Sequence, residues 1–544
     1  MNELRLNGIQ LECGTLGDLV ELRAANGDKP LVWVGEEMVT YAAAHERSNR
    51  MANALAEWGV RKGDVVASLM YNHPDAVCLW FACAKLGAIW APTNVSLAND
   101  DLAYAFNDSR AKTVIVAEEL LPAYQRVRGS LASGRSEFLW GDSGVARDHG
   151  FESFEELLEG EDVRPQVAVA PTDPMAIMYT GGSTGMPKGV LVPHLYYFAN
   201  ALRYQAAAQA TAADIHFAIG HLFHAGGQLL GVAGPMYSNM TTSLARWFSA
   251  SRYWDRVREH GATVIDPIGP IISAIMATAE RPDDRDHKVR IGVGVATGQI
   301  RRELRDAFEK RFNVNLLEVY AQTETGVVLT TETLDDRRGS NGKPRGWVEV
   351  SIVDDNDFAV PPRTVGQILL RPTEPFAFML EYWNKPEQTV KAWRNLWFHT
   401  GDVGYLDEDG YLYFTGRQAH WIRRRGENVS SFEVEQTISA HPAVGEVAVV
   451  GVPSELGDED IKAYVQLSEA GSEVDPMELV RFCEERIAYF KVPRFIEFVT
   501  EFPRSSAKQE IERHKLRERG IGSAWDRERD GVPAGRRGGA TSGT

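Results

Sequence analysis

A glycine-rich stretch, residues 179–190, holds the residues whose types and spacing are best suited to chemistry. It reads Tyr-Thr-Gly-Gly-Ser-Thr-Gly-Met-Pro-Lys-Gly-Val and follows an apolar run, residues 175–178. Glycines let the backbone turn sharply and bring N–H groups close to an anion. The hydroxyls and Lys188 add hydrogen-bond donors and positive charge. The stretch therefore predicts a loop that holds phosphate.

Two common phosphate-binding patterns do not fit this stretch. The pattern G-x-x-x-x-G-K-[ST] needs a lysine directly after glycine and a hydroxyl after the lysine. Here Met186 and Pro187 separate Gly185 from Lys188, and Gly189 follows the lysine. The pattern G-x-G-x-x-G is absent from the stretch as well. A flexible surface turn is the plain alternative, but such a turn does not need Pro-Lys-Gly after Ser-Thr-Gly.

Residues 320–326 offer an aromatic ring, a hydroxyl and a carboxylate after a second apolar run, residues 314–319. A purine could stack on Tyr320, Thr323 could bond a phosphate, and Glu324 could hold Mg²⁺. Taken alone, such a pattern is more often the amino terminus of a helix with a capping residue. Its functional interpretation depends on the other segments.

Three further sites lie toward the carboxyl end of the chain. Asp402 is expected just before a strand, where its carboxylate could bond ribose hydroxyls, and Arg417 could bond ribose or phosphate oxygens. Residues 425–429, which include Gly426, open a smaller unit. Singly, these residues suit a turn cap or a solvated basic face. Together, in one chain and around one phosphate loop, they indicate a nucleotide site.

The elements that must position these residues alternate between strands and helices. Residues 65–70 and 113–117 are typical of buried strands, and residues 73–87 are typical of an apolar helix. Strands that alternate with helices favour parallel sheets with helices on both faces. The sequence therefore predicts an α/β fold, α+β overall.

The composition changes near residue 416, where an Asp-Gly hairpin signal ends and a basic run begins. We expect an N-terminal domain over residues 1–416 that binds ATP and an acid. A smaller mobile domain is expected over residues 417–520, after a hinge near His420. Residues 521–544 contain few large apolar residues and are expected to be disordered.

Bulk properties exclude several classes of protein. The 544 residues are 44% apolar and 24% charged, as in soluble globular proteins, and the net charge of -17 argues against a nucleic-acid binder. The four cysteines form no C-x-x-C pair, which suits a reducing cytosol and argues against a zinc site. No signal peptide is visible, and the longest apolar run is too short to span a membrane. We expect a cytoplasmic protein without integral membrane contact.

With all these segments in one chain, the sequence resembles the adenylate-forming superfamily of acyl-CoA synthetases, luciferases and peptide-synthetase adenylation domains, over about residues 16–516. Residues 422–430 are most similar to carnitine/crotonobetaine-type CoA ligases. The resemblance implies a large N-terminal domain of two sheet–helix subdomains plus a β-barrel, and a small mobile α+β C-terminal domain. It implies an AMP-forming ligase that uses ATP and Mg²⁺. A small-molecule acid attacks the α-phosphate, and an acceptor, commonly the CoA thiol, then displaces AMP. The oligomeric state stays open, a homodimer included.

The resemblance also implies residue roles. Tyr320 stacks on adenine, Thr323 meets the α-phosphate and Glu324 binds Mg²⁺. Asp402 bonds the ribose with help from Arg417. The remaining implied roles belong to the phosphate loop (Thr180, Ser183, Thr184, Gly185 and Lys188, which hold the β- and γ-phosphates), to the acyl pocket (His224), to the pantetheine path (Gly426) and to the catalytic lysine near the carboxyl end (Lys508).

Two departures from the family pattern concern the mobile domain. At the hinge, the family's G-R-x-K-[DE] is replaced by a sequence with Ala419 in place of the lysine and His420 in place of the acid. In residues 503–513, the position of the family's catalytic lysine holds Glu510, and Lys508 matches only if the register slips. A carboxylate at that position would repel phosphates.

Three interpretations stay open. In the first, Lys508 reaches the site and the protein is an ordinary acyl-CoA ligase. In the second, Glu510 replaces the lysine and the enzyme does not use CoA, as in amide formation or in nitrite-activating diazotisation of an aromatic amine. In the third, the chain binds ATP without turnover; the complete set of nucleotide residues argues against it.

Overall fold

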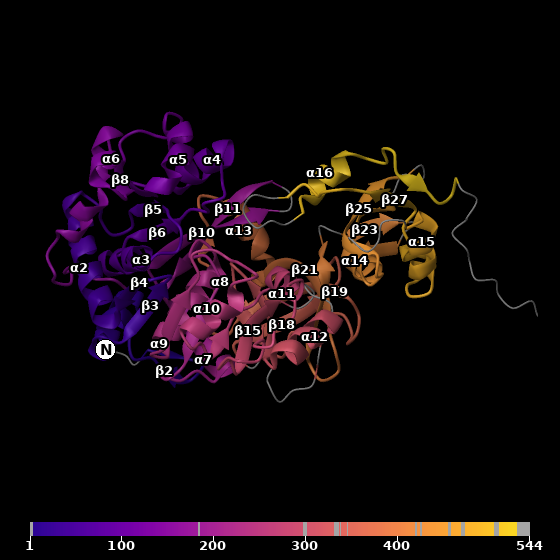
Figure 1. Ribbon diagram of the computed structural model, residues 1–544, viewed down its shortest axis with the longest axis horizontal. Helices are drawn as coiled ribbons and strands as arrows, with labels where there is room; N and C mark the ends of the chain where they lie inside the picture. The colour runs from indigo at the N-terminus through magenta and orange to yellow at the C-terminus, as the bar shows by residue number, and fades with distance from the viewer. Residues whose placement is uncertain are drawn as a thin grey trace, which may run out of the picture. The chain divides into compact units, whose positions relative to one another are not determined.

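The computed structural model describes residues 4–182, 185–296, 302–330, 337, 339–344, 346–418, 421–424, 427–454, 459–468, 474–504 and 511–529 (Figure 1). The chain divides into two compact units. The first comprises Met1–Val350, Leu370–Phe398 and Asp409–Leu412. The second comprises Ser351–Leu369, His399–Glu408 and Tyr413–Thr544. The expected hinge at His420 lies outside the described residues, so the boundary after residue 416 stays a prediction.

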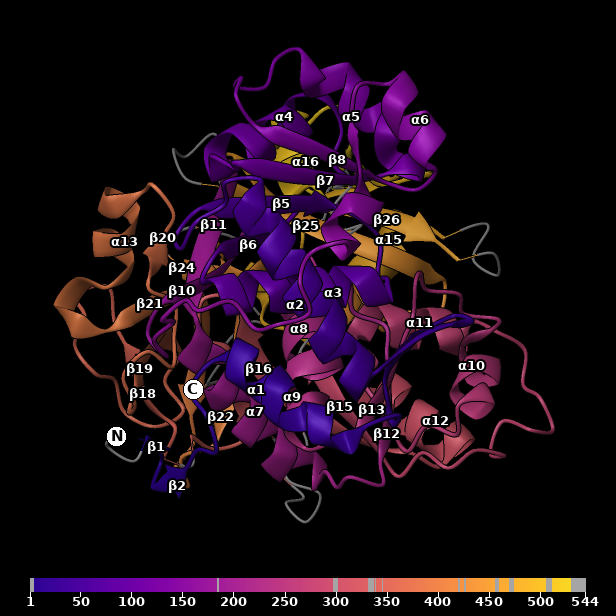
Figure 2. The ribbon, with the colours of Figure 1, turned by 90° about the vertical axis from the view of Figure 1, so that its left-hand side faces the viewer.

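The first unit contains an eight-stranded sheet that is mainly parallel. Its strand order is β20-β11-β10-β6-β5-β7-β8-β9, and β10, β11 and β20 pair antiparallel at one edge. Helices cover both faces, with α4, α5 and α6 on one and α2 and α3 on the other (Figures 1 and 2). The strands are β5 (Val65–Leu69), β6 (Ile89–Pro92), β7 (Thr113–Ala117), β8 (Ser136–Trp140), β9 (Glu152–Ser153), β10 (Pro174–Gly182), β11 (Gly185–Pro193) and β20 (Glu381–Tyr382). The helices are α2 (Tyr41–Glu57), α3 (Pro74–Leu86), α4 (Asn99–Ser109), α5 (Leu121–Arg128), α6 (Ser143–Asp148) and α13 (Pro386–Ala392), which follows β20 in the chain.

A second eight-stranded sheet in the same unit has the order β17-β16-β15-β14-β12-β13-β3-β4. One hydrophobic cluster packs on it with α10, α11 and α12, and another packs with α7. The strands are β3 (Pro30–Val34), β4 (Glu37–Thr40), β12 (Ile215–Ala218), β13 (Thr241–Leu244), β14 (Val264–Ile265), β15 (Ile291–Ala296), β16 (Asn315–Gln322) and β17 (Gly326–Thr330). The helices are α1 (Leu16–Arg23), α7 (His194–Ala208), α8 (Ala225–Gln228), α9 (Gly234–Tyr237), α10 (Tyr253–Glu259), α11 (Gly269–Met276) and α12 (Arg302–Phe312). A short hairpin, β1 (Arg5–Leu6) and β2 (Ile9–Gln10), precedes them.

Helix α3 shows how local sequence signals set an element that the sequence predicts. The His73 imidazole accepts a hydrogen bond from the backbone N–H of Asp75 at 3.1 Å, and Pro74 begins the first turn. Gly87 ends the helix in the left-handed conformation, at φ 69°, which glycine adopts without strain. Apart from Asp75, the helix is buried all round because it contacts β6 of one sheet and β3 and β4 of the other.

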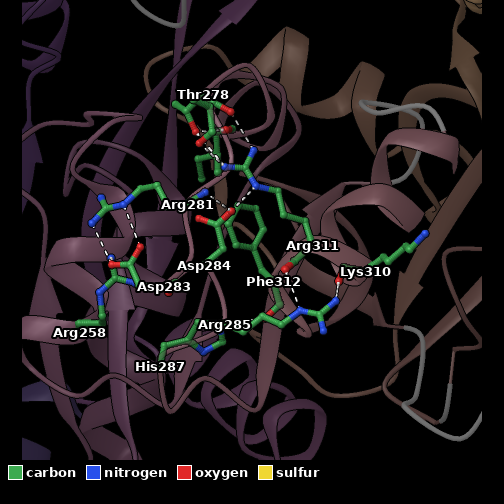
Figure 3. A network of polar contacts seen from close by, with 12 residues as sticks. Arg258, Thr278, Arg281, Asp283, Asp284, Arg285, His287, Lys310, Arg311 and Phe312 are labelled. Carbon is green, nitrogen blue, oxygen red and sulfur yellow. Dashed lines mark hydrogen bonds and ion pairs between the residues drawn. The ribbon is translucent and has the colours of Figure 1, made fainter.

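Side chains from the loop before β15 fix the carboxyl end of α12 (Figure 3). The Arg285 guanidinium donates to the backbone carbonyls of Lys310 and Arg311, at 2.6 and 3.2 Å. In return, Arg311 donates to the Asp284 carboxylate at 2.7 Å. These contacts satisfy carbonyls that a helix end leaves without an intrahelical partner. Phe308 and Phe312 of the same helix lie in the hydrophobic cluster on the second sheet.

The second unit contains a four-stranded sheet, a hairpin and a smaller sheet, with orders β18-β19-β21-β22, β23-β24 and β25-β26-β27-β28. The sequence also predicts strands over residues 446–452 and 462–467 and an amphipathic helix over residues 476–488; the two strands lie within β25 and β26, and the helix is the shorter α15. The strands are β18 (Val348–Val353), β19 (Gly366–Pro372), β21 (Phe398–Leu406), β22 (Leu412–Arg417), β23 (Trp421–Arg424), β24 (Glu427–Ser430), β25 (Val444–Pro453), β26 (Glu459–Leu467), β27 (Phe495–Phe498) and β28 (Trp525–Asp526). The helices are α14 (Ser431–Ser439), α15 (Pro476–Glu484) and α16 (Arg513–Glu518).

The mixed α/β fold expected from the sequence is confirmed, with one correction at the tail. The chain was expected to lose structure from residue 521. Instead, Trp525 and Asp526 form β28 and pair with Ile496 and Phe495 of β27. Arg494 adds an ion pair to Asp526 at 3.1 Å, so this segment closes the smaller sheet. Among the described residues, no helix is long and apolar enough to cross a membrane.

Candidate nucleotide and acid site

The expected phosphate loop is mostly a β-hairpin. Strands β10 and β11 pair antiparallel through it, with Thr180 opposite Lys188 and Gly182 opposite Gly185. The Thr180 hydroxyl donates to the backbone carbonyl of Lys188 at 3.5 Å. Ser183 and Thr184, which lie between the two strands in the sequence, are outside the described part of the chain.

Gly189 is needed at the stem because the hairpin packs tightly there. A Cβ atom at this position would lie 2.7 Å from Cγ2 of Ile177 and 3.3 Å from Cβ of Trp383. Protein interiors are packed too closely to absorb such an overlap without a shift. A glycine after Lys188 thus lets Trp383, the residue after β20, pack closely against β11.

Asp108, at the end of α4, anchors the same stem. Its carboxylate accepts hydrogen bonds from the Tyr179 hydroxyl at 2.9 Å and from Lys385 at 3.0 Å. Tyr104, one turn earlier on α4, donates to the carbonyl of Pro187 at 3.0 Å. Burial, helped by Asp108, raises the pKa of Tyr179, so its hydroxyl stays protonated and keeps donating.

Glu324 lies in the turn between β16 and β17, and Tyr382 of β20 joins it to the phosphate hairpin. The Tyr382 hydroxyl donates to the Glu324 carboxylate at 2.8 Å. The Lys188 ammonium lies over the face of the same ring, 4.6 Å from its centroid. Burial first, and then Glu324, raises the pKa of Tyr382, which keeps this donor protonated. One aromatic ring therefore sits between the lysine and the carboxylate that the sequence assigns to ATP and Mg²⁺.

Sequence reasoning missed Tyr382. Its local sequence, Glu-Tyr-Trp-Asn-Lys-Pro, gives no chemical signal beyond that of a strand that ends before a turn. Its partner Glu324 is 58 residues away in the chain. Only the pairing of β20 with β11, where Tyr382 lies opposite Val190, brings the ring to both charged residues.

Tyr320 and Thr323 lie at the same end of β16. Tyr320 lies within the strand and is 5% exposed, and Thr323 is half-buried in the turn. The pattern that they form with Glu324 is also typical of a helix amino terminus. The structure shows a strand and a turn instead, so that alternative is wrong.

His224 precedes α8 in a turn whose backbone is held by buried amide side chains. Asn72 donates to the carbonyls of Gly220 and Ala245, at 3.1 and 2.7 Å, and accepts from the N–H of Leu222 at 2.9 Å. Gln228 donates to the carbonyl of Leu222 at 2.7 Å. These bonds fix the turn whose side chains the sequence assigns to the acid.

Asp402 and Arg417 form a pair in the second unit. The sequence predicts Asp402 just before a strand, but the structure places it inside β21. Asp402 is only 3% exposed. The guanidinium Nε of Arg417, the last residue of β22, lies 3.3 Å from the Asp402 carboxylate. Arg417 is about half exposed, with 52% of its side chain accessible. A buried carboxylate with an exposed guanidinium beside it could accept bonds from ribose hydroxyls.

Gly426 and Lys508 lie outside the described residues, as do Ala419, His420 and Glu510. Within the described part of the chain, no group of three His, Cys, Asp or Glu residues could hold a metal ion. A single carboxylate such as that of Glu324 fits Mg²⁺, which proteins commonly bind through one or two carboxylates together with phosphate oxygens of the substrate.

Comparisons with known proteins agree with the sequence. A family model for AMP-binding enzymes matches residues 21–383, and one for their C-terminal domain matches residues 433–508. A crotonobetaine/carnitine–CoA ligase of Salmonella typhi is 33% identical over 482 residues, covering 87% of this chain and 92% of the relative.

Solved structures agree as well. An anthranilate CoA ligase in complex with anthranoyl-AMP is 27% identical, with a TM-score of 0.82 over 93% of this chain and 96% of its own. A benzoate CoA ligase of Burkholderia xenovorans LB400 shares the fold, with a TM-score of 0.83 at 24% identity over 92% and 99%. The predicted AMP-forming ligase activity, with ATP, Mg²⁺ and CoA, is confirmed. The chain belongs to the AMP-binding enzyme family, the adenylate-forming superfamily that its motifs indicated.

Proposed function

We propose that Lys188, Glu324 and Tyr382 together position MgATP for an acid–CoA ligase reaction. One observation carries this proposal. Among the described residues, Lys188 and Glu324 form no ion pair, and both contact the same tyrosine. Their charges are therefore available to a ligand, and their spacing is set by a neutral group. Mg²⁺, when bound, would neutralise phosphate charge and polarise the phosphoryl group.

The other predicted residues take the roles that the family resemblance implies. Around the triphosphate we assign Thr180, Ser183, Thr184 and Gly185. Around adenosine and the α-phosphate we assign Tyr320, Thr323, Asp402 and Arg417. For the acid, CoA and the catalytic cation we assign His224, Gly426 and Lys508. These assignments rest on motif position. For Tyr320 and Thr323 they also rest on their places near the end of β16, and for Asp402 and Arg417 on the contact between the buried carboxylate and the half-exposed guanidinium.

The proposed reaction has two displacements. A carboxylate oxygen of the acid bonds to the α-phosphorus, and the bond to pyrophosphate breaks. The CoA sulfur then bonds to the acyl carbon, and AMP leaves with the electron pair of the acyl–oxygen bond. The first step brings an anion to a polyanion, so positive charge at Lys188 and fixed donors on the hairpin lower its barrier.

We propose an aromatic or branched acid as substrate. Gly226, in the α8 turn that follows His224, borders open space, since a Cβ atom there would meet no non-neighbouring atom within 4 Å, whereas Gly227 packs against the backbone of His221. His221, stacked on Phe223 at 4.8 Å between ring centroids, adds a polar group to that turn. The anthranoyl-AMP complex of the similar ligase supports an aromatic acid. We also propose a cytoplasmic enzyme with its mobile domain after residue 416.

A screen for pyrophosphate release tests the function. Aromatic and branched acids, each with and without CoA, are expected to give pyrophosphate and AMP, and CoA is expected to give an acyl-CoA thioester. Glu510, in place of the usual lysine, favours one alternative, in which nitrite and an aromatic amine replace the acid and CoA. AMP formation with nitrite and the amine, but not with any acid and CoA, would overturn the proposal.

The role of Lys508 has its own test. Under the proposal, Lys508→Ala abolishes adenylation of the acid, because it removes the cation that approaches the carboxylate and α-phosphate. Transfer from chemically prepared acyl-AMP to CoA is expected to continue, since that step needs no charge on Lys508. Full adenylation activity in Lys508→Ala would rule the role out.

A further inference from the structure

We propose that one polar face of α7, formed by Tyr196, Asn200 and Arg203, positions the turn that presents Thr323 and Glu324 to MgATP. The three residues are positioning residues, since they contact the turn and not the nucleotide. This inference rests on the proposed function, because it takes from it the roles of Thr323 and Glu324.

The spacing of the three residues places them on one side of the helix. Residues four and seven positions apart in a helix lie one above the other. Tyr196 donates from its hydroxyl to the carbonyl of Thr323 at 2.9 Å. Four residues further along the chain, at the start of β17, the N–H of Val327 donates to the side-chain oxygen of Asn200 at 2.8 Å. Arg203 donates to the carbonyl of the same Val327 at 3.1 Å. The face thus bonds the turn on both sides of Glu324.

The helix and the turn also touch directly. Gly326 has φ 68°, a conformation that favours glycine. A Cβ atom there would overlap the amide group of Asn200. The Asn200 amide is itself oriented, because its nitrogen donates to the carbonyl of Tyr196 at 2.8 Å. With the oxygen of Asn200 committed to Val327, the turn has little freedom to shift along the helix.

Arg203 is an unusual choice for this place if its only task were packing. It is 5% exposed, and its Nε and Nη2 are buried without a hydrogen-bond partner in the described structure. The ring of Trp347 lies 5.3 Å from its guanidinium carbon. Burial lowers the pKa of Arg203 to about 10, so the group still carries its charge at neutral pH. Burying a charge without an ion pair is costly, and an apolar side chain would avoid that cost.

Helix α7 directly follows the strand that carries Lys188, so its contact with the Glu324 turn joins the two charged residues. Strand β11 carries Lys188 and ends at Pro193, and α7 begins at the next residue, His194. The helix therefore connects the strand of the lysine to the turn of Glu324. Tyr382 provides a second connection between the two residues, since it contacts both Lys188 and Glu324. Loosening the α7 face is expected to change the spacing of Lys188 and Glu324 without removing either.

Kinetics of Arg203→Met and Tyr196→Phe test the proposal, with Tyr204→Phe as the matched control. Tyr204 lies on the same helix, and its hydroxyl contacts His216 at 2.6 Å and the sulfur of Met240 at 3.8 Å. Arg203→Met is expected to raise the KM for MgATP and the Mg²⁺ concentration at half-maximal rate about tenfold, with the KM for the acid changed less than about twofold. Tyr196→Phe is expected to shift the same two quantities by about threefold, and Arg203→Lys to restore part of the loss.

The outcomes separate positioning from general damage and from failure of the proposed function. Equal changes in the KM for MgATP and for the acid, or changes no larger than those of Tyr204→Phe, would overturn the positioning role. Should Arg203→Met not fold, Tyr196→Phe decides alone, since it loses a single hydroxyl. Glu324→Gln reports on the function itself. A raised Mg²⁺ requirement in Glu324→Gln with a normal one in Tyr196→Phe and Arg203→Met refutes the α7 role only. A normal requirement in Glu324→Gln refutes the metal role of Glu324 and the inference with it.

Discussion

The two units hold their charged site residues in opposite ways. In the first, Lys188 lies over the Tyr382 ring and Glu324 accepts from the Tyr382 hydroxyl, so neutral groups hold both charges. In the second, the buried Asp402 is paired directly with Arg417, half of whose side chain is exposed. Neutral contacts leave charges free for a ligand, whereas an ion pair must be rearranged before either partner binds one. The first arrangement is preorganised for binding, and the second depends on a side chain that moves at little cost.

Removing the lysine is expected to have the largest effect. Lys188→Ala should lower kcat/KM for adenylation by about 100- to 1000-fold, because a fixed cation near developing phosphate charge is lost. Pyrophosphate release measures it. Lys188→Arg keeps the charge but changes its shape, and should recover part of the loss. Equal activity in Lys188→Ala and the wild type would show that the Lys188 charge does not contribute to adenylation.

Removing one hydroxyl from Tyr382 should have an intermediate effect. Tyr382→Phe keeps the ring under Lys188 but ends the bond to Glu324, and a hydrogen bond to a charged group is worth about 1.5–3 kcal/mol. We expect kcat/KM for MgATP to fall about tenfold or more, with a higher Mg²⁺ requirement. Tyr179→Phe is a suitable control, since it removes a hydroxyl from the stem and not from Glu324. A similar Mg²⁺ shift in both variants would contradict a special role for Tyr382.

The smallest effect is expected at Arg417, the half-exposed member of its ion pair with the buried Asp402. Arg417→Ala should raise the KM for ATP by only about two- to threefold, because water screens a charge on a half-exposed side chain and surface ion pairs contribute about 0–1 kcal/mol. High salt should reduce the difference further, since exposed charges are screened. ATP titrations at low and high ionic strength measure it. A loss as large as that of Lys188→Ala would mean that Arg417 acts on the nucleotide directly and that the two units are more alike than their contacts indicate.

Sequence patterns identified the elements and charged residues whose signals are local. Residues 65–70 and 113–117 are β5 and β7, and the helix expected at residues 73–87 is α3, with His73 and Gly87 at its ends. Glu324 and Lys188 were named from motif spacing alone. In both cases the information lies within a few neighbouring residues.

The missed residues are those whose partners are remote in the chain. Asp108 bonds Tyr179 across 71 residues, and Asn72 bonds Leu222 across 150. An aspartate at a helix end and an asparagine before a helix both have ordinary local explanations as caps. Asp402 was misplaced for a similar reason, because Thr-Gly-Asp looks like a turn, while Gly401 at φ 70° bends a strand that continues through it.

Asn72 has a consequence for how this scaffold changes over time. Its three bonds at the acid turn go to the backbone atoms of Gly220, Leu222 and Ala245, and to no side chain. Substitutions that alter the surface of the turn therefore leave its anchor in place. A pocket attached in this way can diversify its substrate range by single replacements, without a compensating change elsewhere in the framework.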